Sequence, residues 1–289
     1  MSTRDWVGRS TVLSRLLSVA VAVGAIGCYQ NAAAADAAEP EEAPESSVSS
    51  PPMDMDDPGT PGPRGIEVNF VGTLTRLGPG RSSEGLLDAN YGIGDRLQLK
   101  YERPYVTESA GGTEFQKGLG ATEIGVKWRF MDSHGLAIAF YPQYQFDDGF
   151  TLRDEEGNPE QSEGRSAYFP LLASRAMGRV CSLAANYGYR RNLDGRGNDN
   201  NLALGLGRAV GGDGRVMAEV FSERDESFRN RQTDVRLGVF FLPFPKSFEN
   251  SNYETPVYAS LGHSIGKTED GEKSTTFVFG LSLIKKPRT

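Results

Sequence analysis

Several residue types and patterns that reveal function in other chains are scarce in these 289 residues. The chain has two cysteines and two histidines, too few for a disulfide framework or a metal cluster, so neither a metal nor another cofactor is expected. No stretch approaches the roughly 20 consecutive apolar residues that a membrane-spanning helix requires. Mean hydropathy is also low, at -0.44. If this chain crosses a membrane, it must therefore do so with β-strands.

The part of the chain that is expected to fold carries nearly equal numbers of positive and negative charges. The net charge is -7. Nine acidic residues and three arginines in positions 1–57 account for six of these negative charges, so residues 58–289 carry -1. Nothing here forms the basic surface that nucleic-acid binding requires.

The amino terminus has the pattern of an export signal. Three arginines precede an apolar stretch at 16–27, and small residues at 32–38 offer several cleavage positions. We therefore predict that residues 1–38 are a signal peptide. A second possibility is that Ala25-Ile26-Gly27-Cys28, which resembles a bacterial lipoprotein box, directs lipidation of Cys28.

Residues 39–65 are rich in Pro, Ala, Ser and acidic residues, and they show no apolar period. Such a composition does not bury enough apolar surface to order a chain, so a disordered leader is expected. The folded domain is then 66–289. The remaining cysteine, Cys181, is expected as a small apolar side chain on a strand face.

Apolar and polar residues alternate through most of the domain, most clearly at 96–102 and 123–130. Successive side chains of a strand point to opposite faces, so each run forms a ribbon with one apolar and one charged side. A soluble sandwich would bury the apolar side, whereas a membrane barrel would turn it to lipid. We predict an all-β protein, a closed antiparallel up-and-down transmembrane β-barrel of about twelve strands. The expected strands lie near 66–77, 86–92, 96–107, 119–131, 135–147, 167–177, 180–192, 200–210, 215–225, 232–243, 255–267 and 274–285.

Connection lengths give the barrel a direction, because bacterial barrels have short periplasmic turns and longer outer loops. Short turns are expected after even strands, with one long exception at 243–254, and longer connections after odd strands, beginning with 78–85. Pro104, Pro142 and Pro170 fall inside expected strands, where a missing N–H indicates a bulge or a rim position.

Charge in lipid is costly, about 2–4 kcal/mol for each Lys or Arg at the midplane, so the charged register must face the lumen. Lys100 and Glu102 are expected near residues 123, 127 and 129 on the neighbouring strand. The set either fills a narrow barrel with ion pairs or lines a polar channel that selects solutes. Its members are Glu67, Arg96, Lys100, Glu102, Glu123, Lys127, Arg129, Arg190, Glu219, Asp234 and Arg236.

Three segments resemble a known family. The segments 90–99 (NYGIGDRLQL), 103–105 (RPY) and 118–130 (GLGATEIGVKWRF) are similar to outer-membrane proteins known from the meta pathway of phenol degradation. Ala121 departs from the more usual Asp. The resemblance implies a channel or transporter-like barrel for small, often aromatic, compounds, and it brings no catalytic residues.

Two other functions compete with a channel. A lipid hydrolase would need a Ser/His pair, but His134 lies in an expected turn, and His263 and Ser264 are adjacent on a strand and so point to opposite faces. The other is a structural or adhesive barrel. The expected location is the bacterial outer membrane, and the expected partners are membrane lipid, a small solute and the barrel-assembly machinery during biogenesis.

Overall fold

The computed structural model describes residues 48–109, 116–146, 164–178, 180–195, 197–211, 214–243, 253–265 and 271–285. The expected signal segment 1–38, which includes Cys28, and leader residues 39–47 lie outside these ranges. Among the residues described, no helix is long and apolar enough to cross a membrane.

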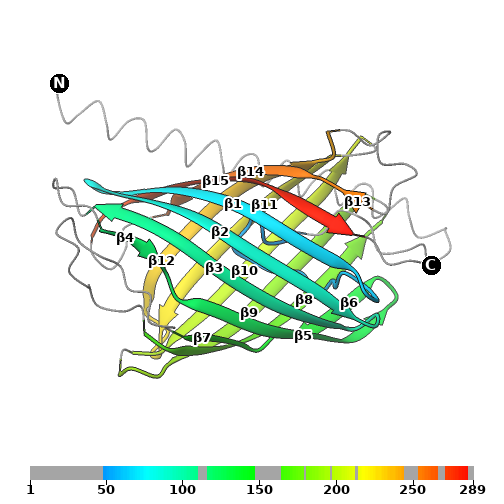
Figure 1. Cartoon of the computed structure of the whole chain (residues 1–289), viewed down its shortest axis with the longest axis horizontal. Coiled ribbons are helices and arrows are strands. Elements are labelled where there is room, and N and C mark those ends of the chain that lie inside the picture. The colour runs from blue at the N-terminus through cyan, green and yellow to red at the C-terminus, as the bar shows by residue number, and fades with distance from the viewer. Residues whose placement is uncertain are drawn as a thin grey trace.

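The described residues form fifteen β-strands that belong to one antiparallel sheet (Figure 1). Three pairs of these strands, β4 with β5, β6 with β7 and β13 with β14, continue one another, so the barrel has twelve strands. The bounds are β1 (Ile66–Leu77), β2 (Gly80–Ile93), β3 (Leu97–Ser109), β4 (Gln116–Leu119), β5 (Thr122–Ser133), β6 (Leu136–Phe140), β7 (Gln143–Phe146), β8 (Ser166–Met177), β9 (Cys181–Asn192), β10 (Asp199–Val210), β11 (Gly214–Asp225), β12 (Asn230–Phe241), β13 (Tyr253–Glu254), β14 (Val257–Ser264) and β15 (Ser274–Lys285).

The three breaks lie at prolines, as the sequence indicated for two of them. β4 and β5 part at 120–121, opposite Pro104 of β3. β6 and β7 part at Pro142, opposite Pro170 of β8. Pro256 separates β13 from β14. Proline has no backbone N–H to donate, so the ladder loses a bond at each position and the strand bends there.

The sheet closes on itself through its first and last strands. β1 pairs with β2 on one side and with β15 on the other, with Ile66 opposite Lys285 and Leu77 opposite Ser274. Each of the twelve continuous strands therefore has two neighbours, and the described residues form a closed sheet. The expected fold class, a closed antiparallel barrel of twelve strands, is confirmed.

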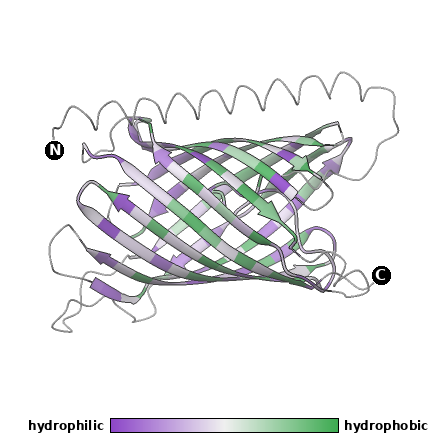
Figure 2. Cartoon of the chain, turned by 90° about the horizontal axis from the view of Figure 1, so that it is seen from above, coloured by the Kyte–Doolittle hydropathy of each residue, from purple (hydrophilic) through white to green (hydrophobic). Residues whose placement is uncertain are grey.

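The two faces of the strands differ as the alternation predicted. On β5, Ile124, Val126 and Trp128 are 46%, 43% and 52% exposed, while Lys127 between them is only 4% exposed. Figure 2 shows the same alternation of hydrophobic and hydrophilic residues along the strands. The apolar side chains form the outer wall and the charged ones point inward, which is the arrangement a bilayer requires.

Connections match the expected direction at most positions. At one end the connections are short, since three residues or fewer separate β2 from β3, β5 from β6, β8 from β9 and β10 from β11. The expected loop at 78–85 is wrong, because β2 begins at Gly80 and only residues 78–79 connect it to β1. Gly78 has φ 54°, which lets the chain reverse in two residues.

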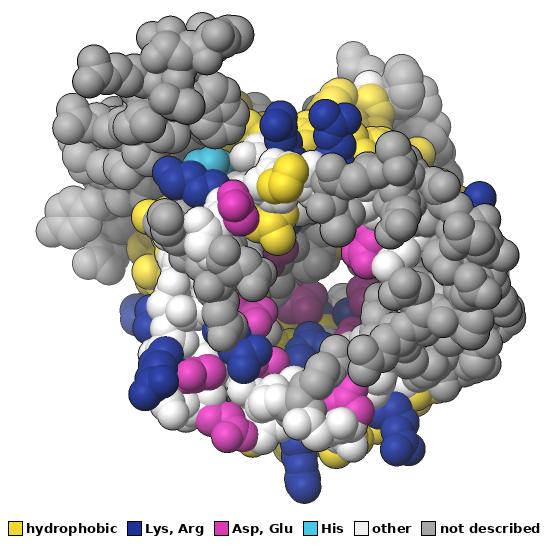
Figure 3. All heavy atoms as spheres, turned by 90° about the vertical axis from the view of Figure 1, so that its left-hand side faces the viewer, with side chains coloured by type: hydrophobic (Ala, Val, Ile, Leu, Met, Phe, Trp, Pro, Cys, Tyr) yellow, Lys and Arg dark blue, Asp and Glu magenta, His cyan; other side chains and the backbone are white. Residues whose placement is uncertain are grey.

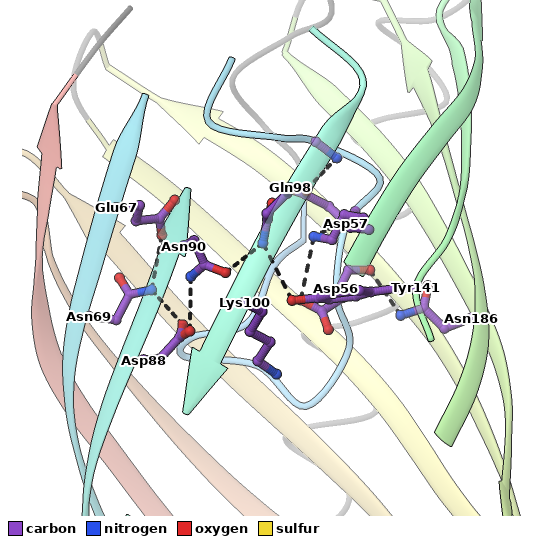
Figure 4. Close-up of polar contacts among 12 residues, drawn as sticks. Asp56, Asp57, Glu67, Asn69, Asp88, Asn90, Gln98, Lys100, Tyr141 and Asn186 are labelled. Carbon is purple, nitrogen blue, oxygen red and sulfur yellow. Dashed lines mark hydrogen bonds and ion pairs between the residues drawn. The ribbon is translucent and has the colours of Figure 1, made fainter. Parts of the chain in front are cut away.

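Residues 48–61, here named the plug, fold into the barrel. They contact inward-facing residues of β5, β9, β10, β11, β12 and β14, and so lie inside the lumen (Figure 4). Val48, Met53 and Met55 are at most 3% exposed. The expected disordered leader thus has an ordered carboxyl-terminal part, because its few apolar side chains are concentrated where the barrel interior buries them.

Candidate functional site

The lumen wall carries most of the charged residues that the alternation placed there. Ten of the eleven lie on the inward face of a strand, and one does not. Arg96 is exposed in the turn at 94–96, because β3 begins one residue later than expected, at Leu97. Arg129 lies at the same end, where it donates to the carbonyl oxygen of Asp95 (2.8 Å) and pairs with Asp132 (3.0 Å). Cys181 is the first residue of β9, and it is completely buried.

The expected cluster between β3 and β5 is present. Lys100 Nζ lies 2.8 Å from Glu102 Oε1 and 2.9 Å from Glu123 Oε1. All three side chains are at most 20% exposed, so the two carboxylates depend on this one ammonium group for charge compensation.

A chain of neutral and acidic side chains crosses β1, β2, β3 and the region between β6 and β7, and Glu67 is the one member that the sequence predicted to face inward. Its members are linked by hydrogen bonds from one strand to the next, as Figure 4 shows. Inward-facing amides gave no charge signal in the sequence, although they share the register of the charged residues. The members are Glu67, Asn69, Asp88, Asn90, Gln98 and Tyr141.

Lys127 connects this wall to the plug. Its Nζ donates to the carbonyl oxygen of Asp57 (2.9 Å) and lies 3.8 Å from the Asp56 carboxylate. It also lies 4.6 Å from the centre of the Tyr141 ring, within the range of a cation–π contact. Asn186 of β9, on another part of the wall, donates to the carbonyl oxygen of Asp56 (2.9 Å).

The lumen is also lined by charge nearer the end where β3 finishes. Arg190 donates to Gln145 Oε1 (3.1 Å) and to Ser166 Oγ (3.3 Å), and it stacks over the Tyr168 ring at 4.8 Å. Asp234 accepts a hydrogen bond from Ser274. Viewed from this end, Figure 3 shows a hollow with acidic and basic side chains inside it.

Glu219 of β11 binds the backbone of the plug. Its two carboxylate oxygens accept hydrogen bonds from the N–H groups of Asp54 (3.0 Å) and Met55 (2.8 Å). The Glu219 residue is 1% exposed, so these two donors replace the water that a carboxylate would otherwise bind.

Arg236 of β12 binds a carboxylate and a carbonyl of the plug. Its Nη2 lies 2.8 Å from Asp54 Oδ2, and its Nη1 donates to the carbonyl oxygen of Pro52 (3.2 Å). Ser260 Oγ of β14 donates to the same carbonyl (2.7 Å). The plug is thus held at its centre by donors from two strands.

Apolar contacts hold the plug between these polar groups. An ideal Cβ on Gly205 would lie 2.4 Å from Met55 Sδ, and one on Gly238 would lie 2.6 Å from Met53 Sδ. The wall therefore has room for the two methionines only because these positions lack side chains. The apolar cluster consists of Val48, Met53 and Met55 of the plug with Ala184, Ala203, Met217, Phe221 and Phe240 of the wall.

A polar cavity of about 190 Å³ remains between the plug and the wall formed by β1, β2, β3 and β5. Carboxylates, amides and the ammonium groups of Lys100 and Lys127 line it. Within the described ranges, no group of His, Cys, Asp and Glu side chains is arranged to hold a metal ion.

The two residues of the hydrolase alternative have separate partners. His263 Nδ1 lies 2.9 Å from Thr275 Oγ1, whereas Ser264 Oγ accepts a hydrogen bond from the Ser274 N–H (2.9 Å). Ser264 is buried and His263 is half-buried, which agrees with their opposite directions on β14.

The closed sheet, the apolar outer wall and the polar lumen define a bacterial outer-membrane β-barrel. The fold is similar to that of a crystal structure of an outer membrane channel from Pseudomonas putida F1, with a TM-score of 0.57 and 11% sequence identity over 81% of this chain and 99% of that one. It is also similar to the NanC porin, with a TM-score of 0.52 and 9% identity over 74% of this chain and 98% of that one. No protein-family model matches the sequence, and no curated protein matches it.

Proposed function

We propose that this protein is an outer-membrane channel for small solutes and that the plug narrows its lumen in the present state. One observation carries the proposal: the wall leaves room in the middle of the barrel for a peptide segment and a further polar cavity of about 190 Å³. A small barrel of about eight strands can fill its interior with side chains of its own wall. Here the wall has glycines at Gly205 and Gly238, and the filling segment lies outside the barrel strands.

The similarity to the Pseudomonas putida F1 channel and to the NanC porin is consistent with this proposal, because those proteins share the barrel architecture. The family resemblance of the segments 90–99 and 118–130 adds an aromatic solute class. Phe221 and Phe240, on the inner wall, supply aromatic surface for such a solute. Signal cleavage, the alternative lipidation of Cys28 and folding by the barrel-assembly machinery remain part of the proposed route to the outer membrane.

Conductance in planar bilayers tests the channel. The full chain is compared with a released-plug variant that carries Met53→Ser, Asp54→Asn and Met55→Ser, which removes both methionine side chains and the Asp54–Arg236 ion pair without shortening the chain. We expect a small current from the wild-type protein and a severalfold larger one from the released-plug variant.

The control is heat-modifiability in detergent, which reports a folded barrel in both proteins. A folded released-plug variant that carries no ion current would contradict the channel and favour the structural or adhesive barrel.

A further inference from the structure

The plug occupies a place in the lumen that has two kinds of surface side by side. We propose that this place is the solute-binding site of the channel, and that its ligand is a small molecule with an apolar body and a carboxylate group. The inference rests on the proposed function and names the substrate class. According to this proposal, the plug and the solute compete for the same residues of the barrel wall.

The apolar half of the site lies on β9, β10, β11 and β12. Ala184, Ala203 and Met217 are at most 8% exposed, and Phe221 and Phe240 pack against the same cluster. A water-filled pore does not need such a surface, since apolar lining hinders the passage of ions and water. Without the plug, these side chains and the bare backbone at Gly205 and Gly238 would face water. An apolar ligand body would cover them as the methionines do.

The carboxylate half is defined by what Arg236 binds now. Its guanidinium lies 2.8 Å from the Asp54 carboxylate, and the residue is 7% exposed. Asp54 stands between Met53 and Met55, so the wall receives a carboxylate flanked by two apolar groups. Arginine binds carboxylates in a planar, often bidentate geometry, and this selects a carboxylate over a hydroxyl or an amide.

When a solute replaces the plug, the charged residues of the wall still have partners. Glu219 and Arg236 are directly opposite each other on β11 and β12, and both point inward. Directly opposed residues have Cβ atoms about 4.5–5.5 Å apart, close enough to form an ion pair. When the plug leaves, Arg236 has enough donors to bind Glu219 and a ligand carboxylate together. The wall therefore avoids an unpaired buried charge while the plug is out.

Competition predicts that the plug weakens solute binding. A protein whose binding-competent state is sparsely populated shows an apparent affinity reduced by that population. The released-plug variant removes this competition and keeps every wall residue of the site.

Isothermal titration calorimetry with the detergent-solubilised full chain tests the site. Benzoate is the probe, benzyl alcohol lacks the carboxylate and acetate lacks the apolar body. We expect benzoate to bind the released-plug variant roughly tenfold or more tightly than the wild-type protein. Benzyl alcohol and acetate should bind both proteins only weakly.

The wall is tested in the released-plug background. Arg236→Gln should weaken benzoate binding by about thirtyfold, the loss typical for removing one partner of a buried charge pair. Arg229→Gln, in the exposed connection between β11 and β12, is the matched control and should leave binding unchanged. Because Arg236→Gln could unfold the barrel, Arg236→Lys serves as the second variant. It keeps the charge and should retain part of the affinity.

Benzoate affinity that is equal with and without the Arg236 side chain, or benzyl alcohol binding as tight as benzoate binding, would overturn the site. If either result is obtained and the protein still conducts ions, the proposed channel function stands and only the proposed binding site is rejected. Conversely, if benzoate binding depends on Arg236 and the protein carries no ion current, the binding site stands and the channel function is rejected.

Discussion

At the scale of single residues, Gly205 shows how one absent side chain shapes the lumen. An added Cβ would lie 2.4 Å from Met55 Sδ and 3.0 Å from Val48 Cγ1. Met55 has a flexible side chain, but Val48 is short and β-branched, and it is completely buried. A methyl group at this position therefore requires the Met55 side chain to turn away and Val48 to shift, which loosens the packing of the plug.

We expect Gly205→Ala to increase conductance severalfold and to expose the plug to added protease. Alanine itself should not harm the strand, since it loses less conformational entropy on folding than glycine. Gly85→Ala is the matched control, because an added Cβ on Gly85 would have no neighbour within 4 Å. The same current from Gly205→Ala and Gly85→Ala would show that Gly205 does not position the plug.

Lys100 offers a second test at this scale. Lys100→Met leaves the carboxylates of Glu102 and Glu123 close together without their cation. We expect the free energy of unfolding, measured by denaturant titration in detergent, to fall by about 3 kcal/mol.

The matched variant adds Glu102→Gln and Glu123→Gln to Lys100→Met, which removes all three charges. Most of the lost stability should return, since no unpaired charge is left in the wall. Failure of the triple variant to recover would assign the loss to the packing of the Lys100 side chain instead.

The sequence predicted the inward charges well because lipid leaves little choice of face. Lys100, Glu123 and Lys127 follow from the period of two and the cost of charge in a bilayer. It did not predict Asn69 or Gln98, since uncharged amides give no such signal, and it misplaced Arg96 because alternation does not show where a strand turns.

At the scale of elements, the plug is the part of the fold that could not be predicted from the sequence. Composition averaged over 39–65 indicates disorder, and a strand period is absent. Order here comes from partners far away in the chain: Glu219 lies 165 residues from Asp54. The twelve strands were predictable from local alternation, whereas this segment depends on the closed barrel around it.

The exchange of partners between β11 and β12 gives a prediction for this pair of strands. In the wild-type protein, Glu219 and Arg236 both bind the plug. In the released-plug variant they should bind each other more strongly. A double-mutant cycle with Glu219→Gln and Arg236→Gln should show a coupling energy about 1 kcal/mol larger in the released-plug background. Equal coupling in the two backgrounds would argue against the exchange.

At the scale of the whole molecule, the outer wall determines where the protein resides. Leu204 lies near the middle of β10 and Val210 at its end, and they are 55% and 51% exposed. If lipid surrounds this wall, depth and not exposure sets the cost of a charge. Leu204→Arg should lower the free energy of unfolding in liposomes by about 2–4 kcal/mol, and Val210→Arg by about 0–1 kcal/mol. Equal costs at the two positions would contradict a membrane-embedded barrel.

The pairing of β1 with β15 also sets an order of events during biogenesis. An enclosed lumen exists only after the last strand has joined the first. The plug precedes β1 in the chain and is synthesised before every strand, yet one of its wall partners, Ser260, lies on β14. The earliest part of the folded chain to leave the ribosome therefore completes its contacts only after nearly every strand has been made.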